Sequence, residues 1–271
     1  MTFERELAAN RALWDEWVDV NARSELYGLE EFKAGGVKIP QFMQDEVGDV
    51  TGKSLLHLQC HFGMDTLSWA RLGASVTGVD FSPRAVEFAT QLAEELSIEA
   101  SFVQADVLEL DRVLEGEFDI VFTSIGAVNW LPDLGRWGEV VAHFVKPGGF
   151  FYICDLDPFS LVFDDEAEQP ELRFRYPYFT RDEPIEVVTK GSYADQEADV
   201  KQPVHYDWVH DMGEIVTVLA EAGVRIEFLH EHPFGIEVQF PFMQKGADGL
   251  YRLPVGMPEI PLLFSLRARK D

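Results

Sequence analysis

The chain has 271 residues, 46% of them hydrophobic, and this length and composition predict one large core without a split into separate globular units. Its 48 acidic residues outnumber 22 basic ones, and the resulting net charge of −26 argues against DNA or RNA as a partner. The sequence lacks the roughly 18 consecutive apolar residues of a membrane span, and its first residues are too charged for a signal peptide. We therefore expect a cytoplasmic protein that binds neither nucleic acid nor membrane.

The first fifty residues predict a helical lid that leads into the core. From Phe3 to about Val20, the apolar residues Leu13, Trp14 and Trp17 lie near one face of a helix. The residues up to 49 are mixed and predict a short helix and loops. This leader could close over a cavity or simply pack against the sheet, and the sequence leaves both possibilities open.

Residues 51–154 alternate short apolar runs with longer amphipathic ones, which is typical of a parallel sheet covered on both faces. The predicted strands are Ser54–Leu58, Ser75–Val79, Ala100–Gln104, Phe118–Thr123 and Gly149–Cys154. The predicted helices are Asp65–Leu72, Pro83–Leu96 and Leu134–Phe144, with a short segment near Asp111–Leu114. Ser82 before Pro83 is a typical helix start. Cys60 and Cys154 lie in separate apolar runs, so we expect reduced, structural thiols.

After Cys154 the pattern changes to aromatic residues interleaved with acidic and turn residues. We expect an inserted, aromatic-rich cover at about 156–208, with strands at Arg173–Phe179 and Ile185–Thr189. A helix follows over Asp211–Ala222, with Asp211 and Glu214 at capping-box spacing. Two further strands, Val224–Leu229 and Pro261–Arg269, complete residues 51–271 as the main domain.

The stretch from Ser54 to Ser82 carries the clearest functional signal. An apolar run, a turn that ends in Gly63, an amphipathic segment and a second apolar run are followed by Asp80. This is the order of a βαβ unit in which the first turn faces a ligand and the carboxylate after the second strand accepts ribose hydroxyls. The sequence therefore predicts a nucleoside cofactor.

Five segments in sequence resemble the motifs of class I S-adenosylmethionine-dependent methyltransferases. They are LHLQCHFG at 56–63, VTGVDFS at 76–82, QADV at 104–107, FTSIGAVNWLPD at 122–133 and VKPGGFF at 145–151. The resemblance implies an α/β fold with a seven-stranded, mostly parallel, doubly wound Rossmann-like sheet and an antiparallel last strand. It also implies S-adenosyl-L-methionine as the cofactor, lying across the carboxyl ends of the first strands.

The first motif departs from the family pattern. Where the family has three glycines at alternate positions, this chain has Gln59, His61 and Gly63. Glycines there adopt positive φ and let the backbone approach the ligand. The side chains of Gln59 and His61 either contact the methionine part of the cofactor or turn away and leave the contact to backbone amides; loss of binding is a third alternative.

The resemblance assigns roles to other positions one by one. Asp80 is expected to accept both ribose hydroxyls, Phe81 to stack near adenine, and Asp106 to accept the adenine amino group beside the backbone amide of Val107. Ser124 and Ile125 are expected beside the sulfonium, and Trp130, with Asn129, is expected to form a wall of the adenine or acceptor site. The complete set of expected cofactor-binding residues is Gln59, Cys60, His61, Gly63, Asp80, Phe81, Asp106, Val107, Ser124, Ile125 and Trp130.

A general base is needed only if the acceptor is a hydroxyl or an amine. His205, Tyr206 and His210 lie in the segment expected to overhang the cavity, and His210 is the first candidate for catalysis, although a purely structural role is open for each. His230 and His232 share a strand face, but lack acidic or Cys partners at the spacing of a metal motif, so we expect no metal site.

The sequence thus favours methyl transfer to a small-molecule acceptor, apolar or aromatic, mainly by proximity and orientation. A non-catalytic S-adenosylmethionine-binding sensor or scaffold is the alternative. A nicotinamide-dependent oxidoreductase is a second one, but it requires a G-x-G-x-x-G turn that this chain lacks. For the assembly, we expect a monomer or a homodimer.

Overall fold

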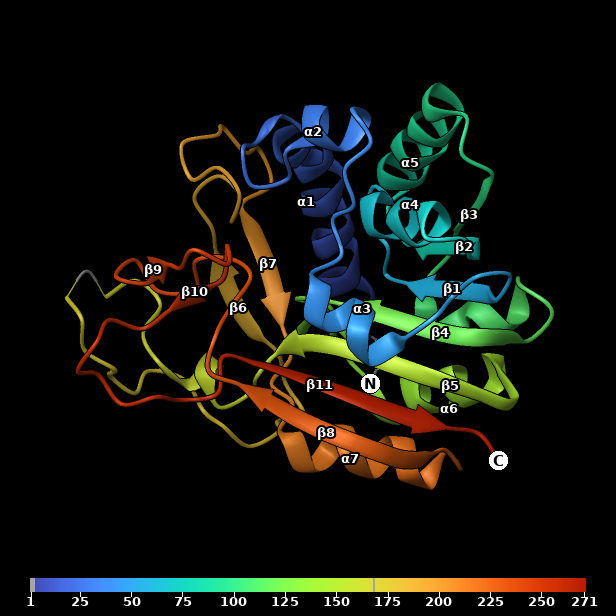
Figure 1. Ribbon diagram of the computed structural model, residues 1–271. Helices are drawn as coiled ribbons and strands as arrows, with labels where there is room; N and C mark the ends of the chain where they lie inside the picture. Colours follow the sequence, from blue (N-terminus) through green and yellow to red (C-terminus); the bar gives the residue numbers. More distant parts are fainter. Residues whose placement is uncertain (1–2, 168) are drawn as a thin grey trace.

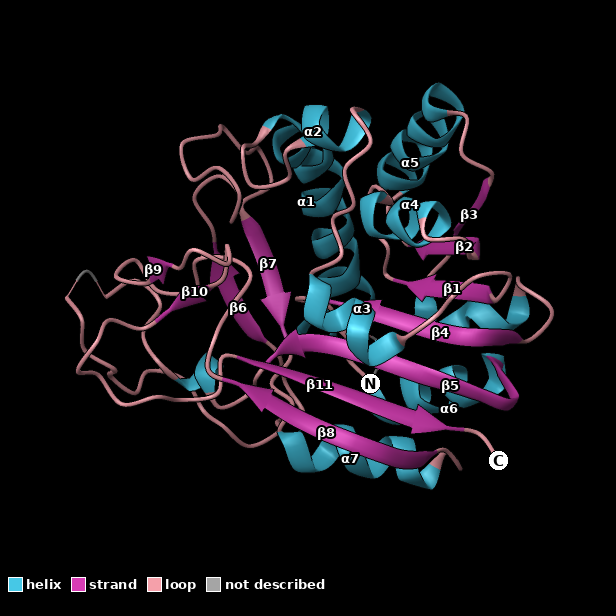
Figure 2. Cartoon of the chain, in the orientation of Figure 1, coloured by secondary structure: helices cyan, strands magenta, loops and turns pink. Residues whose placement is uncertain are grey.

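The computed structural model describes residues 3–167 and 169–271. Its centre is a seven-stranded sheet in the order β3-β2-β1-β4-β5-β11-β8 (Figures 1 and 2). The strands of this sheet are β1 Ser54–Leu58, β2 Ser75–Asp80, β3 Ala100–Gln104, β4 Phe118–Ser124, β5 Val145–Leu156, β8 Arg225–His232 and β11 Leu263–Arg269. The helices are α1 Glu4–Arg23, α2 Leu29–Lys33, α3 Gln41–Val47, α4 Met64–Arg71, α5 Pro83–Leu96, α6 Leu134–Phe144 and α7 Met212–Glu221, with 3₁₀ turns η1 Val107–Arg112, η2 Val128–Trp130 and η3 Ser160–Val162.

The predicted doubly wound α/β sheet is confirmed. The strands β1 to β5 are parallel, whereas β11 is antiparallel to both of its neighbours, β5 and β8. The order of the strands reverses beside β1, because β2 and β3 lie on one side of it and β4 and β5 on the other. Ligands of open α/β sheets bind at the carboxyl ends of the strands at such a reversal.

Helices cover both faces of this sheet. On one face α6 and α7 bury Trp137, Phe144 and Leu219 against Phe151 and Phe264 of the strands. On the other face α3 and α4 pack onto β1, β4 and β5. The helices α1, α2, α4 and α5 form an adjoining apolar cluster beside β3. The sheet is therefore buried on both sides, as the near-continuous apolar runs of β4 and β5 predict.

Local sequence signals explain most of the boundaries. The Ser82 hydroxyl accepts a hydrogen bond from the Ala85 amide (3.0 Å) and caps α5, and Asp211 accepts from the Glu214 amide (3.0 Å) at the start of α7. The predicted bounds of α5 and α6 match the structure residue for residue. The strand β5 begins earlier than predicted because its first residues pair with β4 across a register shift. Cys60 and Cys154 are buried and unpaired, as expected.

The cover gathers at the carboxyl ends of β1, β4 and β5, on the left in Figure 1. It contains a hairpin of β6 Ile185–Val188 and β7 Val204–Asp207, and a smaller one of β9 Gln244–Lys245 and β10 Tyr251–Arg252. The predicted strand at Arg173–Phe179 is wrong. Only an isolated bridge of Phe174 to Phe163 forms there, since Pro177 has no amide for a ladder and β6 pairs with β7 instead.

The helix α1 packs against β7 of this cover and also against α5, which belongs to the main domain. The Asn10 side chain donates to the Tyr206 carbonyl (2.8 Å) and accepts from the Tyr206 amide (2.8 Å), so it binds α1 to β7 in the manner of another strand. The Trp17 indole donates to the Gly191 carbonyl (2.9 Å). Across the described ranges, each helix is too short or too polar to traverse a bilayer.

Candidate active site

A large cavity of about 1360 Å³ lies where the carboxyl ends of the strands meet α1 and the cover. Every residue that the sequence predicts for cofactor binding lines it. Four segments thus converge on one space, as the order of the strands requires. They are the first βα turn, the end of β2, the loop after β3 and the loop after β4.

The first turn keeps its expected backbone shape without the family's glycines. Gln59 has φ of 57° and His61 has φ of 49°, both in the left-handed region that non-glycine residues rarely occupy. Gly63, with φ of 79°, begins α4, and a Cβ there would lie 2.8 Å from the Phe102 ring. The chain therefore accepts strain of about 1 kcal/mol or more at each of two positions to keep this turn.

The side chains of this turn make internal contacts. The Gln59 amide donates to the Ala127 carbonyl (2.8 Å), and its Oε1 is buried without a hydrogen-bond partner among the described residues. The His61 ring lies 3.3 Å from the Asn21 amide and packs edge-on against Trp14, with ring centroids 4.9 Å apart. Burial lowers the pKa of His61 to about 3, so its ring is neutral.

Asp80 stands at the end of β2 as predicted and is 7% exposed. Its two oxygens accept from the His61 amide (2.7 Å) and the Ser82 amide (2.9 Å). Burial raises the pKa of Asp80 to about 6, although these hydrogen bonds act in the opposite direction. Each oxygen keeps a second lone pair for a donor in the cavity.

Asp106 also has a structural partner, because its carboxylate accepts from the Leu108 amide (3.0 Å) and begins η1. Val107 follows it, and Phe81 lies between Asp80 and the α5 cap; both line the cavity. The structure therefore brings Asp80, Phe81, Asp106 and Val107 to the same wall.

Ser124 belongs to a buried polar network on the cavity floor. Its hydroxyl donates to Asp65 (2.9 Å) and lies 3.1 Å from Nε2 of His57, whose Nδ1 lies 2.8 Å from the Thr66 hydroxyl. Burial lowers the pKa of His57 to about 3 and raises the pKa of Asp65. A neutral His57 that donates from Nε2 and accepts at Nδ1 satisfies every member of this network.

Sequence reasoning missed Asp155, which shapes the loop after β4. This buried carboxylate accepts from the amides of Gly126 (2.5 Å), Ala127 (3.1 Å) and Val128 (3.0 Å). It holds the segment that carries Ile125 and Trp130 over the end of the sheet. A lone Asp at the end of a strand is too common a signal to single out in advance.

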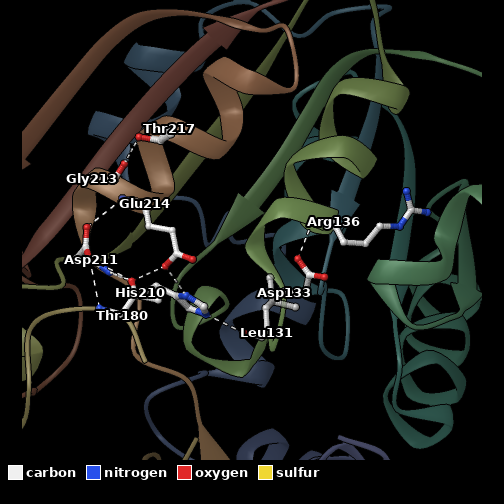
Figure 3. Close-up of polar contacts among 9 residues, drawn as sticks. All are labelled: Leu131, Asp133, Arg136, Thr180, His210, Asp211, Gly213, Glu214 and Thr217. Carbon is white, nitrogen blue, oxygen red and sulfur yellow. Dashed lines mark hydrogen bonds and ion pairs between the residues drawn. The ribbon is translucent and has the colours of Figure 1, made fainter. Parts of the chain in front are cut away.

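His210, the first candidate for a base, has both ring nitrogens engaged (Figure 3). The Glu214 carboxylate lies 2.8 Å from Nδ1 and the Leu131 carbonyl oxygen lies 2.7 Å from Nε2. Both partners are hydrogen-bond acceptors within the protein, so both ring nitrogens are engaged and neither is left for a ligand. Its geometry ties α7 to the loop after η2.

His205 is placed differently. It lines the cavity from β7, is 7% exposed, and has Nε2 at 3.6 Å from the Asp207 carboxylate. Its Nδ1 is buried and has no partner among the described residues. Its ring lies against Trp130, with centroids 5.2 Å apart. Of the three candidates for catalysis, His205 is the one that lines the cavity without a hydrogen bond at its ring among the described residues.

Tyr206 follows His205 on β7 and so points to the opposite face of the strand. Its hydroxyl accepts from Arg5 (3.0 Å) and donates to Glu186 (2.8 Å), and it does not belong to the cavity lining. The structure thus does not bring Tyr206 to the other candidates.

Aromatic residues of distant segments form a wall that we call the aromatic wall, defined as Trp14 and Trp17 of α1, Trp130 of η2 and Tyr193 of the cover. The ring centroids are 5.1 Å apart for Trp14 and Trp17, 5.2 Å for Trp14 and Trp130, and 5.4 Å for Trp17 and Tyr193, in edge-to-face pairs. The sequence indicated the aromatic face of α1 but not its partners. Glu237, from the loop after β8, also lines the cavity and was not anticipated.

Comparisons with known proteins agree with this geometry. Residues 55–149 match the family model described as a methyltransferase domain. A ubiquinone biosynthesis O-methyltransferase of Cronobacter sakazakii is 28% identical over 153 residues, which are 56% of this chain and 60% of that protein. One of Bordetella pertussis is 25% identical over 75% of this chain and 85% of its own length. The match therefore covers less than two thirds of the first of these relatives.

Solved structures share the fold over a larger part of the chain. An S-adenosylmethionine-dependent methyltransferase of Mesorhizobium loti has a TM-score of 0.60 at 17% identity and covers 88% of this chain and 100% of its own. The glycopeptide N-methyltransferase MtfA, solved in complex with S-adenosylmethionine, has a TM-score of 0.53 at 17% identity and covers 84% of this chain and 85% of its own. Residues 55–149 thus match a methyltransferase domain, and the chain shares its fold with S-adenosylmethionine-dependent methyltransferases.

Proposed function

We propose that this protein binds S-adenosyl-L-methionine in the large cavity and transfers its methyl group to a small-molecule acceptor. The observation that carries the proposal is Asp80, a carboxylate at 7% exposure whose pKa is raised to about 6 by burial and which keeps free lone pairs toward the cavity. A buried carboxylate with such a pKa is typical of a group that serves a ligand.

The residues of the cavity fit this cofactor. Asp80 would accept the two ribose hydroxyls, and Phe81, Asp106 and Val107 would hold the adenine. Two buried atoms of the first turn, Gln59 Oε1 and His61 Nδ1, have no hydrogen-bond partner among the described residues. The residues of this turn line the cavity, so the methionine part of the cofactor would lie against them.

When bound, the cofactor supplies an activated methyl group on a sulfonium, so the protein's contribution is mainly orientation and exclusion of water. The aromatic wall and the β6–β7 hairpin close the cavity opposite the strand ends and serve both needs. The floor network of Asp65, Ser124 and His57 holds the end of β4 rigid, since each member is hydrogen bonded.

We assign the proton transfer, where an acceptor requires it, to His205. Asp207 lies 3.6 Å from its Nε2, so a carboxyl group stands beside the ring. Asp207 is itself held by the Asn129 amide, 3.3 Å away. His210 acts as a positioning residue, because it links Leu131 to Glu214.

The sequence relatives are named as O-methyltransferases of ubiquinone biosynthesis. We do not transfer their substrate to this chain, because fold and domain similarity carry the chemistry but not the acceptor. The aromatic wall supports an acceptor with apolar or aromatic parts, and the net charge of −26 speaks against nucleic acid.

Isothermal titration calorimetry with S-adenosylmethionine, S-adenosylhomocysteine and NAD tests the proposal. The first two are expected to bind and NAD is not. Asp80→Ala should weaken S-adenosylmethionine binding ten-fold or more, in line with about 1.5–3 kcal/mol for hydrogen bonds to a charged group. Glu99→Ala, which removes an exposed carboxylate outside the cavity, is the matched control.

Equal affinity of Asp80→Ala and wild type would show that the ribose is not held at β2. Binding of NAD alone would favour the oxidoreductase alternative. Tight binding of S-adenosylmethionine without methyl transfer to any member of a panel of small amines, phenols and thiols, followed by mass spectrometry, would favour the sensor or scaffold.

A further inference from the structure

The charge of the cavity is strongly one-sided. Only Lys38 and Lys190 bring positive side chains to its lining, and Lys38 already pairs with Glu31 at 3.3 Å. Nine carboxyl groups line the same space: Asp65, Asp80, Asp106, Asp155, Asp165, Glu166, Asp207, Glu237 and Asp248. Such a space repels carboxylates and phosphates and concentrates cations.

Some of these carboxylates are neutralised by arginines, and the others are not. Arg175 lies 2.7–3.9 Å from the acidic run at 164–166, and Arg252 lies 2.7 Å from Asp248. In contrast, Asp155, Asp207 and Glu237 have no Lys or Arg within ion-pair distance among the described residues. These three are in the part of the cavity that the loop after β4, β7 and the loop after β8 enclose.

The aromatic wall lines the same cavity as these carboxylates. Its rings meet edge to face, so that the planes of Trp14 and Trp17 are 80° apart and those of Trp17 and Tyr193 are 82° apart. All four residues line the cavity, and an aromatic surface attracts ammonium groups through cation–π attraction. Trp130 continues this wall to His205.

Glu237 and Tyr193 both line the cavity. Burial raises the pKa of Tyr193, and the negative charge of Glu237 contributes in the same direction. Burial, followed by the charge of Asp155, raises the pKa of Glu237 itself to about 7. Two carboxyl groups are therefore held close together in a poorly hydrated place, an arrangement that a bound cation would relieve.

His205 supplies an observation independent of these charges. It is 7% exposed, lines the cavity beside Trp130, and has a buried Nδ1 without a partner among the described residues. Its Nε2 has no hydrogen bond within the described residues and is the nitrogen left for a ligand beside Trp130.

We propose that the methyl acceptor is an amine, which enters the cavity as an ammonium cation and is held between the aromatic wall and the carboxylates of Glu237 and Asp207. This inference rests on the proposed function and names the substrate class of the same site. It excludes acceptors whose reactive end is a carboxylate or a phosphate.

The reaction balances as follows. The ammonium loses one proton to the imidazole of His205, and the nitrogen lone pair then attacks the methyl carbon. A nitrogen–carbon bond forms, the carbon–sulfur bond breaks, and its electron pair stays on the sulfur, which becomes a neutral thioether. The methylated nitrogen carries the positive charge, so the product remains a cation.

The test measures tryptophan fluorescence of the full chain saturated with S-adenosylhomocysteine, so that the cofactor site is filled. The probes are choline, which carries a trimethylammonium group, and its uncharged carbon isostere 3,3-dimethylbutan-1-ol. We expect choline to bind at least ten-fold more tightly. Glu237→Gln should reduce this ratio five-fold or more, whereas Glu183→Gln, exposed on the cover and outside the cavity lining, should leave it unchanged.

Trp130→Leu localises the effect, because it keeps an apolar side chain but removes a cation–π partner, and it should also narrow the ratio. Equal binding of the two probes, or a ratio that Glu237→Gln and Trp130→Leu both leave intact, overturns the amine assignment. Saturation by S-adenosylhomocysteine in the same sample shows that the cofactor site of the proposed function stands when the amine assignment fails. Failure to bind S-adenosylhomocysteine would remove the proposed function and this inference with it.

Discussion

The first βα turn keeps positive φ values although the glycines that usually adopt them are absent. Gln59 and His61 hold positive φ values where glycines are the usual solution. Their side chains instead brace Ala127 and pack against Trp14. The motif could be found from the sequence because Gly63 and Asp80 remained, but the conformation of the two altered positions could not, since neither residue favours it.

Asp80 predicts a pH dependence of cofactor binding. Its pKa in the free protein is about 6, and the ribose hydroxyls need the carboxylate form as acceptor. The affinity should be constant above pH 7 and fall by about ten-fold per unit below pH 6. Calorimetry with S-adenosylhomocysteine from pH 5 to pH 8 measures this. Asp80→Asn should bind weakly with no inflection near 6; an inflection that persists in this variant would assign the proton to another group.

Glu237 predicts a pH-dependent loss of stability, because its ionised form destabilises the folded state. Its folded pKa, about 7, exceeds the ordinary value of 4.5, so the folded state binds its proton more tightly than the unfolded chain does. The free-energy cost of ionising Glu237 in the folded state is absent below pH 4.5. It grows between pH 4.5 and about pH 7 and is complete above pH 7. Glu237→Gln should therefore raise the melting temperature at pH 8 and change it little near pH 5. A variant that is destabilised at pH 8 would contradict the assignment.

At the scale of elements, the contact between α6 and α7 is unusually close at Gly138. A Cβ at this residue would lie 2.9 Å from the Val218 carbonyl oxygen of α7. Gly138→Ala should push the two helices apart and cost about 1–3 kcal/mol of unfolding free energy, measured by urea denaturation. Gly135→Ala in the same helix is the control. Its Cβ would meet only the Asp133 side chain at 3.3 Å, so helix propensity should make it neutral or stabilising by up to about 1 kcal/mol.

The regular elements were predictable wherever local chemistry decides them. The helix α5 has a Ser-Pro start, and β1 and β3 are short apolar runs between turn signals, so their bounds agree with the structure. The cover was predictable only as an insert. Its strand pairing depends on which segment meets β6 in space, and alternation at 173–179 carries no such information.

The same limit applies to the site. Asp80, Asp106 and Ser124 follow strands whose ends must meet, so their convergence could be expected from the order of the elements. Glu237 and the tryptophans of α1 reach the cavity through packing of segments remote in sequence. A periodic aromatic face such as that of α1 predicts burial, but not what it is buried against.

At the scale of the whole molecule, the net charge of −26 predicts stabilisation by salt. Self-repulsion among the acidic side chains weakens the folded state, and screening relieves it. At pH 7.5 the melting temperature should rise by several degrees between about 0.05 M and about 1 M NaCl. The sequence pI is about 4.5, so at that pH the same salt range should have little effect. A rise of equal size at both pH values would point to general salting-out instead.

The attachment of α1 to the β6–β7 hairpin has a consequence for traffic in and out of the cavity. Asn10 and Trp17 of the helix donate hydrogen bonds to the carbonyls of Tyr206 and Gly191. Glu16 accepts one from the Lys201 amide (2.7 Å), so hydrogen bonds join the helix to the hairpin at several points. A movement of α1 that opens the cavity must therefore move the β6–β7 hairpin with it, and a movement of the hairpin must move α1. An opening movement on this side of the cavity therefore involves α1 and the β6–β7 hairpin as one unit, although the two are far apart in the sequence.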